Sequence, residues 1–112
     1  MVSKKYTLEI SPDAERDLDE IDNYLRHHFL SEQAAESIMG NIKTSLSDLI
    51  QFPEIGINAA DRIGKEKLPD IYQNIRMIIS GSYLIFYVLE GSTVQIYRVL
   101  YQKRDWINLF RK

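Results

Sequence analysis

Residues Ile71–Tyr101, IYQNIRMIISGSYLIFYVLEGSTVQIYRVLY, contain three strand-like runs separated by two turn signals. The runs are rich in β-branched and aromatic residues, and Ser80-Gly81-Ser82 and Glu90-Gly91-Ser92 are typical of tight hairpin turns. The middle run, Tyr83–Leu89, is apolar on both faces, which is expected of a central strand. The stretch therefore predicts an antiparallel meander of three strands.

The residues before the meander predict one strand and two helices. Lys4–Ile10 alternates between polar and apolar residues, as a half-buried strand does. Ser11-Pro12 suits a helix start, and apolar residues at steps of three or four predict a helix from Pro12 to His28 or Phe29. A second helix is predicted from Ser31 to Pro53, and the short link between the two indicates an antiparallel hairpin.

The remaining segment before the meander, Asn58–Asp70, has weak periodicity and predicts a loop, with room for one irregular turn. Together these elements indicate a single α+β domain over residues 1–112. We expect the N-terminal strand to join the meander in a four-stranded sheet, with the helices on one face.

The composition excludes several classes of site. The 112 residues include no cysteine, so disulfides, thiolate metal sites and cysteine nucleophiles are absent. His27 and His28 lack a third ligand at metal spacing, and no phosphate loop, serine elbow or nucleotide fingerprint is present, so we expect no metal and no cofactor. The sequence has no membrane-length apolar run and no signal-peptide pattern, so we expect a cytoplasmic protein.

Charge is divided unevenly along the chain. Residues 1–56 carry five basic and eleven acidic residues, a net charge of −6, whereas residues 57–112 carry nine basic and five acidic residues, a net charge of +4. Two interpretations stay open. The C-terminal half presents a surface to a polyanion, or the acids form the solvated faces of the two helices.

Arginines interrupt the apolar pattern of the meander. With two-residue turns, Arg76 faces Tyr87 and Arg98 faces Ile85, so both arginines share one face of the sheet. Because an unpaired arginine cannot be buried, this face is predicted to be open, with the helices on the opposite face against Leu84 and its neighbours. A three-residue turn would move Arg76 to the other face.

The two arginines and nearby tyrosines suit phosphates and stacked bases. We therefore predict a functional role for Arg76, and substrate binding by Arg98 and Tyr87. The alternative for Arg98 is an ion pair with a carboxylate that holds the C-terminal segment in place. Lys103 and Arg104 follow the last strand, where they reach a ligand or form an ordinary solvated basic end.

At this point the sequence resembles the RelE/ParE superfamily of bacterial toxins from type II toxin–antitoxin modules. The similar stretches are ISPDAERDLDEIDNYL, FPEIG, IRMIISGSYLIFYVL and VQIYRVLYQKRDW, in the same order as in the family. The resemblance implies a growth-arresting toxin that a cognate antitoxin neutralises by wrapping it with a helix or an extended segment. The family's fold agrees with the elements predicted above.

The resemblance also implies a target. RelE-like members cut mRNA on the ribosome without a metal, and ParE-like members inhibit DNA gyrase. We favour the mRNA endoribonuclease because the C-terminal third is basic and rich in tyrosine, with gyrase inhibition as the alternative and a non-toxic antitoxin-binding module as a second alternative. The implied catalytic residues are Arg76, Arg104 and Tyr101, with Tyr97 as another source of a hydroxyl, and Arg98, Lys103 and Tyr87 bind substrate.

Two positions depart from the nuclease pattern. Leu84 stands where RelE-like nucleases usually carry an arginine, and Phe110 stands near the position of their C-terminal catalytic tyrosine. The YLIFY and RVLYQKRDW segments look more like the ParE-like branch, and Leu84 and Phe110 keep the non-toxic module open.

Overall fold

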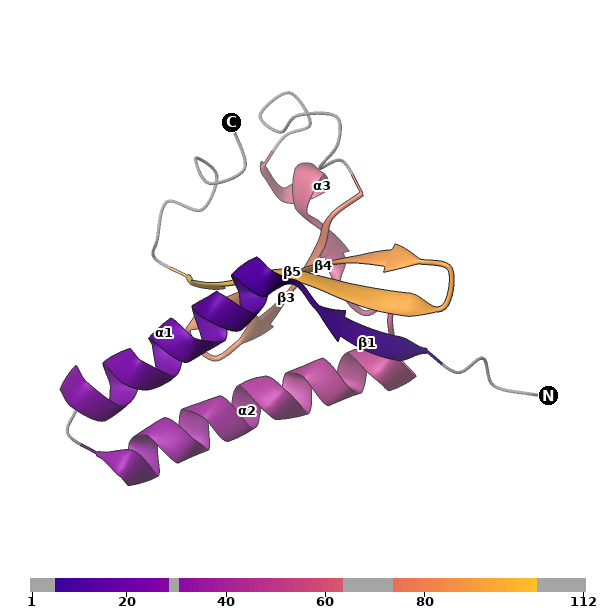
Figure 1. Ribbon diagram of the computed structural model, residues 1–112. Coiled ribbons are helices and arrows are strands. Elements are labelled where there is room, and N and C mark those ends of the chain that lie inside the picture. The colour runs from indigo at the N-terminus through magenta and orange to yellow at the C-terminus, as the bar shows by residue number, and fades with distance from the viewer. Residues whose placement is uncertain (1–5, 29–30, 64–73, 103–112) are drawn as a thin grey trace.

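The computed structural model describes residues 6–28, 31–63 and 74–102. The elements are β1 (Thr7–Ile10), α1 (Pro12–His28), α2 (Glu32–Gln51), β2 (Ile57–Asn58), α3 (Ala59–Ile63), β3 (Arg76–Ser80), β4 (Tyr83–Glu90) and β5 (Thr93–Tyr101). The five strands form one sheet in the order β1-β5-β4-β3-β2, in which β1 runs parallel to β5 and the other pairs are antiparallel. The helices α1 and α2 lie beside each other on one side of the sheet, and α3 lies on the other side (Figure 1).

The long helices begin where the sequence predicts. The hydroxyl of Ser11 accepts a hydrogen bond from the Ala14 N–H at 3.0 Å, and the Ser31 hydroxyl accepts one from the Ala34 N–H at 3.1 Å. Each bond satisfies a backbone donor that the first turn of a helix leaves free. The Ser11 hydroxyl also donates to the carbonyl of Tyr97 at 2.9 Å, which ties the start of α1 to β5.

Both hairpin turns have two residues, as the sequence predicts. Gly81 and Gly91 adopt φ angles of 59° and 60°, which glycine reaches without the steric cost that a side chain imposes. The register of the first hairpin therefore places Arg76 opposite Tyr87, as predicted, and that of the second places Tyr87 opposite Ile96.

A β-bulge changes the rest of the second hairpin. Tyr97 is the extra residue in β5, so Arg98 lies opposite Phe86 and Val99 lies opposite Ile85. The prediction that Arg98 faces Ile85 is therefore wrong, because it assumed a regular ladder beyond Tyr87.

The sheet buries apolar side chains on both faces. Tyr83, Ile85 and Tyr87 of β4 pack against the long helices, together with residues such as Ile42 and Leu49 of α2. The alternate side chains of β4 lie in a second cluster, formed by Ala59, Ala60, Ile75, Met77, Leu84, Phe86 and Leu100. The predicted assignment of the faces is therefore reversed: the face that carries Arg76 holds the long helices.

Two short elements occupy part of the segment that was predicted as a loop. The strand β2 adds a fifth strand to the sheet, beside β3, and α3 follows it directly. The side-chain oxygen of Asn58 starts α3 by accepting hydrogen bonds from the Ala60 and Asp61 N–H groups at 2.9 and 3.2 Å. Because α3 contributes Ala59 and Ala60 to the second cluster, helices cover both faces rather than one. Within the described ranges, no helix has the length and apolar character needed to cross a membrane.

Candidate functional site

Arg76 is the first predicted site residue, and it lies at the edge of the face that packs against the long helices. Its guanidinium donates hydrogen bonds to the carbonyl oxygens of Gly56 at 3.0 Å and Glu54 at 3.3 Å. Both acceptors belong to the link between α2 and β2. Backbone carbonyls therefore accept hydrogen bonds from the Arg76 guanidinium, which explains how an arginine can lie on this face.

Tyr87 holds the same link from inside the core. Its side chain has no exposed surface, and its hydroxyl donates to the Pro53 carbonyl at 2.8 Å and accepts from the Gly56 N–H at 2.9 Å. Burial raises the pKa of Tyr87, so the hydroxyl stays neutral and keeps its proton for Pro53. Tyr87 was predicted to bind substrate, but because its side chain is fully buried a substrate cannot contact it in this conformation.

The close approach of Tyr87 explains the glycine in the FPEIG stretch. A methyl group at Gly56 would overlap the Tyr87 hydroxyl and would lie 2.8 Å from its Cε1 atom. We call Arg76, Tyr87 and the link Pro53–Gly56 that they hold the link clamp. The clamp fixes the exit of α2 against the third and fourth strands.

Arg98 makes the ion pair that the sequence left open as its alternative role. Its Nε and Nη2 atoms lie 2.7 and 2.9 Å from the two carboxylate oxygens of Asp17 in α1. The Asp17 carboxylate also accepts the Val99 N–H at 3.0 Å, just after the bulge in β5. The side chain of Asp17 is 6% exposed and that of Arg98 is 21% exposed. The hydrogen bonds to Asp17 are the main cause of the raised pKa of Arg98.

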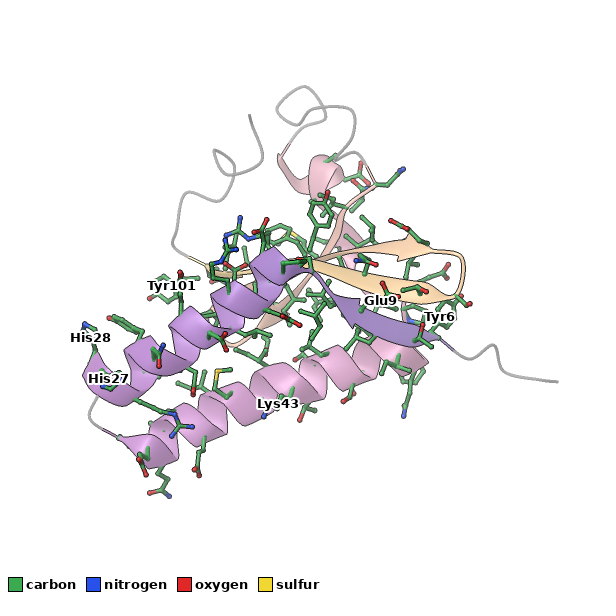
Figure 2. The ribbon with its side chains drawn as sticks, viewed as in Figure 1. Tyr6, Glu9, His27, His28, Lys43 and Tyr101 are labelled. Atoms are coloured by element: carbon green, nitrogen blue, oxygen red, sulfur yellow. The ribbon has the colours of Figure 1, made fainter. Side chains whose placement is uncertain are left out.

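Tyr101 is 45% exposed at the end of β5, on the side of the sheet where α1 runs (Figure 2). Its ring meets that of Tyr83 edge-on, with 5.8 Å between the ring centroids and 62° between the planes. The pKa of Tyr83 is raised, mainly by burial and to a lesser extent by the nearby Tyr101 and Tyr24, so its hydroxyl remains a neutral donor at ordinary pH.

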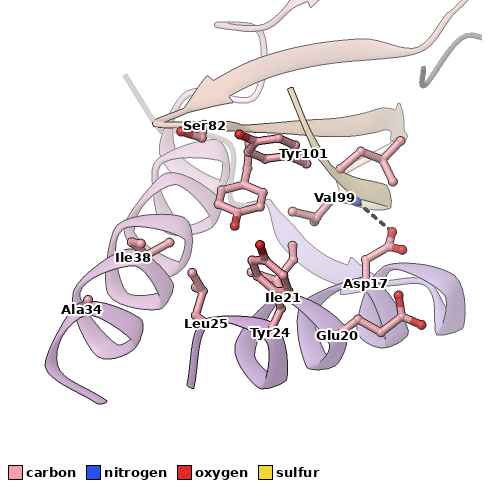
Figure 3. Close-up of a pocket in the computed structure, with 12 residues that line it drawn as sticks. Asp17, Glu20, Ile21, Tyr24, Leu25, Ala34, Ile38, Ser82, Val99 and Tyr101 are labelled. Atoms are coloured by element: carbon pink, nitrogen blue, oxygen red, sulfur yellow. Dashed lines mark hydrogen bonds between the residues drawn. The ribbon is translucent and has the colours of Figure 1, made fainter. Parts of the chain in front are cut away.

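These tyrosines line a groove between the long helices and the sheet (Figure 3). The groove has a volume of about 600 Å³ and a mainly apolar lining, with Ile21, Tyr24 and Leu25 on the α1 side and Val99 and Tyr101 on the strand side. We call it the helix–sheet groove. Asp17 and Glu20 of α1 also line it.

The described residues do not bring the predicted catalytic groups together. Tyr101 pairs with Tyr83 and Arg76 pairs with Tyr87, so the two lie four residues apart along β4 and on opposite sides of it, roughly 13 Å along the strand alone. Arg104 and Lys103 lie outside the described residues, as does Phe110. Leu84 is buried in the second cluster, on the face away from α1 and α2. Within residues 6–28, 31–63 and 74–102, no three side chains of His, Cys, Asp or Glu form a group that could hold a metal ion.

Sequence reasoning missed Asp17 and Tyr24. Asp17 interrupts the apolar stripe of α1 three residues after Ala14 and next to Leu18, and a charge on a buried stripe needs a partner. That position was the available signal. Tyr24 lies beside Leu25 at the edge of the same stripe, and its ring stacks on His28 with 4.4 Å between centroids.

Residues 8–106 match the family model described as ParE toxin of type II toxin-antitoxin system, parDE. A chain of the chromosomal ParDE toxin–antitoxin system from P. aeruginosa is similar in structure, with a TM-score of 0.67, 18% sequence identity and coverage of 88% of this chain and 98% of that chain.

A second similar structure is the toxin–antitoxin complex RelBE2 from Mycobacterium tuberculosis, with a TM-score of 0.53, 21% identity and coverage of 87% of this chain and 98% of that chain. At these identities the likeness concerns the fold. No curated protein matches the sequence.

Proposed function

We propose, from the premise that this chain belongs to the ParE toxin family of type II toxin–antitoxin systems, that it arrests growth by inhibiting DNA gyrase. The chain is a toxin of such a system, as the family match over residues 8–106 shows. Gyrase is the target that the resemblance implies for ParE-like members. In this account the toxin acts by binding a protein rather than by cutting RNA.

One observation carries the choice of target: three of the side chains predicted for phosphate chemistry, Arg76, Arg98 and Tyr87, make contacts within the fold. Attack of a ribose 2′-hydroxyl on phosphorus needs cations at the developing charge and a proton acceptor within hydrogen-bond reach. Among the described residues, Arg76 binds backbone carbonyls, Arg98 binds Asp17 and the Tyr87 hydroxyl is buried. These contacts favour a structural role for all three.

The cognate antitoxin is the proposed partner of the helix–sheet groove. The two similar structures belong to toxin–antitoxin systems, and the groove has an apolar lining that includes tyrosines. Tyrosine contributes a large apolar surface and a polar hydroxyl at low entropic cost, which suits protein interfaces. An antitoxin segment with apolar side chains fits this chemistry.

Ribosome-dependent mRNA cleavage is the second candidate, because Tyr101 is exposed at the point where the chain continues to Lys103 and Arg104. In that account Tyr101 and Arg104 are catalytic, with Arg76 in support, and Arg98 and Lys103 bind the RNA. A non-toxic antitoxin-binding module is the third candidate, and it rests on Leu84 in place of the expected arginine.

Induced expression with parallel readouts separates the candidates. Gyrase inhibition predicts filamentous cells and DNA-damage signalling while translation continues at first. Cleavage of mRNA predicts immediate translation arrest with cuts at ribosome-bound codons. In that case Tyr101→Phe and Arg104→Ala each abolish the cleavage. The module predicts normal growth.

In vitro, purified chain is added to gyrase and to a translation extract. Inhibited supercoiling with intact mRNA supports the proposal. Cut mRNA with unaffected supercoiling overturns it.

A further inference from the structure

The helix–sheet groove has two chemically different ends. Figure 3 shows Asp17 and Glu20 at one end and the apolar residues Leu25, Ala34 and Ile38 at the other. Along α1, the step from Asp17 to Leu25 is roughly 12 Å at the usual helical rise. A ligand that lies along the groove therefore meets carboxylates at one end and an apolar surface at the other.

The acidic end carries a net negative charge. The charge of Asp17 is balanced by Arg98, whose guanidinium lies 2.7 and 2.9 Å from the two carboxylate oxygens. Glu20 is exposed and forms no ion pair with any residue of the described part of the chain. Among the described residues that line the groove, none is basic. The charge of Glu20 is therefore available to a cation that enters the groove.

Tyrosine rings add to the attraction for a cation. Tyr24 is 50% exposed and Tyr101 is 45% exposed, and both line the groove with Tyr83. The face of an aromatic ring attracts a cation that lies within about 6 Å of its centre. The rings and Glu20 thus favour the same sign of charge in a ligand.

The strand wall of the groove is ordered before a ligand binds. The Ser11 hydroxyl donates to the Tyr97 carbonyl at 2.9 Å, and the Asp17 carboxylate accepts the Val99 N–H at 3.0 Å, so α1 holds both sides of the β-bulge. Beyond the bulge, the ring of Tyr101 packs edge-on against Tyr83. An ordered wall loses little conformational entropy when a ligand binds.

We propose that the helix–sheet groove binds a small organic amine, in which a protonated amino group is carried on an aromatic or branched apolar body. The ammonium lies near the Glu20 carboxylate and a tyrosine ring, and the apolar body fills the space between Ile21, Leu25 and Ile38. The groove volume of about 600 Å³ is in the range of small-molecule sites, about 300–1,000 Å³.

The charge of the groove selects among ligands of the same shape. A neutral ligand gains the apolar contact alone, and an anion is repelled by Glu20 and by the faces of the rings. The site depends neither on the target of the toxin nor on the antitoxin. Because the antitoxin is proposed for the same groove, the amine site is tested on the toxin without it.

The test uses the full chain and three probes of similar shape: tryptamine, which is cationic, tryptophol, which is neutral, and indoleacetate, which is anionic. Titration followed by NMR of the backbone amides measures each affinity. We expect tryptamine to bind about tenfold more tightly than tryptophol, because an ion pair and a cation–π contact add to the same apolar contact. Indoleacetate should bind more weakly than tryptophol.

The same spectra locate the ligand. The amide signals of Tyr24, Val99 and Tyr101, which line the groove, should shift as tryptamine binds. The signal of Ile57, which is not among the groove residues, should stay in place.

Matched variants separate the two sources of attraction. Glu20→Gln should lower the affinity for tryptamine about fivefold and leave that for tryptophol unchanged, because it removes only a charge. Glu15→Gln is the control on the same helix: this exposed residue lies outside the groove, so both affinities should stay the same. Tyr24→Leu keeps an apolar side chain and removes a ring, so the affinity for tryptamine should fall more than that for tryptophol.

Three results overturn the proposal. The first is an absence of tryptamine binding up to about 10 mM, a concentration at which a fitting ligand of this size binds. The second is an equal affinity for tryptamine and tryptophol, or a preference for tryptamine that survives in Glu20→Gln. The third is a concentration-dependent dimer of the free chain that shifts the same amides, because a second copy would then fill the groove.

Discussion

Replacing Tyr87 by phenylalanine tests the link clamp, because the change removes one hydroxyl and keeps the ring in the core. The lost hydroxyl leaves the Gly56 N–H and the Pro53 carbonyl, both buried, without their partner. Each buried backbone group without a partner costs about 1–3 kcal/mol, so we expect a loss of about 3 kcal/mol in the free energy of unfolding. For a chain of this size the loss corresponds to a decrease of about 10 °C in Tm.

Urea unfolding followed by circular dichroism measures this free energy. The midpoint should fall while the slope m stays the same, because the surface exposed on unfolding does not change. Tyr101→Phe is the matched control: its side chain is 45% exposed and lies outside the clamp, so we expect a change below about 0.5 kcal/mol. If Tyr87→Phe unfolds within about 0.5 kcal/mol of the unmodified chain, the two hydrogen bonds do not hold the link and the reasoning is refuted.

Three further predictions concern the same fold. Gly56→Ala should lower the free energy of unfolding by about 1–3 kcal/mol, because the added methyl group overlaps Tyr87. Gly40→Ala in α2 has open space at its Cβ position and should raise that free energy by up to about 1 kcal/mol. Thermal unfolding that shifts both variants in the same direction contradicts this. Asp17→Ala should lower the free energy of unfolding by about 3 kcal/mol, because it leaves the mostly buried Arg98 guanidinium and the Val99 N–H without their acceptor. Asp13→Ala, which removes an exposed ion pair, should lower it by about 0.5 kcal/mol or less. Equal urea midpoints for the two variants speak against the buried pair. Because the pKa of Tyr87 is raised in the folded chain, above about pH 10 the unfolded chain releases a proton that the folded chain keeps, so stability present below that pH is lost as pH rises. The free energy of unfolding should therefore fall less steeply with alkaline pH in Tyr87→Phe than in the unmodified chain. Parallel curves for the two proteins would show that Tyr87 does not cause the loss.

The sequence predicted the parts of the fold that local chemistry determines. Ser11 and Ser31 mark the helix starts because their hydroxyls cap the first turns. Gly81 and Gly91 identify both turns because each adopts a positive φ angle. These signals lie within a few residues of the element that they determine, so they can be read without knowledge of the tertiary structure.

The features that the sequence did not reveal depend on distant partners. The central strand is apolar on both sides, so its sequence does not indicate which face the long helices cover. Arg76 was predicted to lie on an open face, but its acceptors are the backbone carbonyls of Glu54 and Gly56, which the sequence does not reveal. The bulge at Tyr97 shifts the register of β5, and Arg98 binds Asp17, which is 81 residues away in the sequence. Two-residue β2 exists only because β3 lies beside it.

The candidate site was predicted unevenly for the same reason. The sequence predicted that Tyr101 ends the last strand, but its side of the sheet depends on the bulge at Tyr97, which places Tyr101 opposite Tyr83 in the helix–sheet groove. The groove itself needs α1, so Tyr24 and Asp17 could not be assigned to it from the order of residues alone. Whether Tyr101 acts in catalysis stays a prediction.

The most direct test of the central claim is a supercoiling assay with purified DNA gyrase and increasing amounts of the purified chain. The account predicts that the chain inhibits supercoiling, that addition of the cognate antitoxin restores it, and that mRNA in a parallel translation extract stays intact. The account would be contradicted if supercoiling were undiminished and the unmodified chain cut mRNA at ribosome-bound codons while the Tyr101→Phe variant left the mRNA intact.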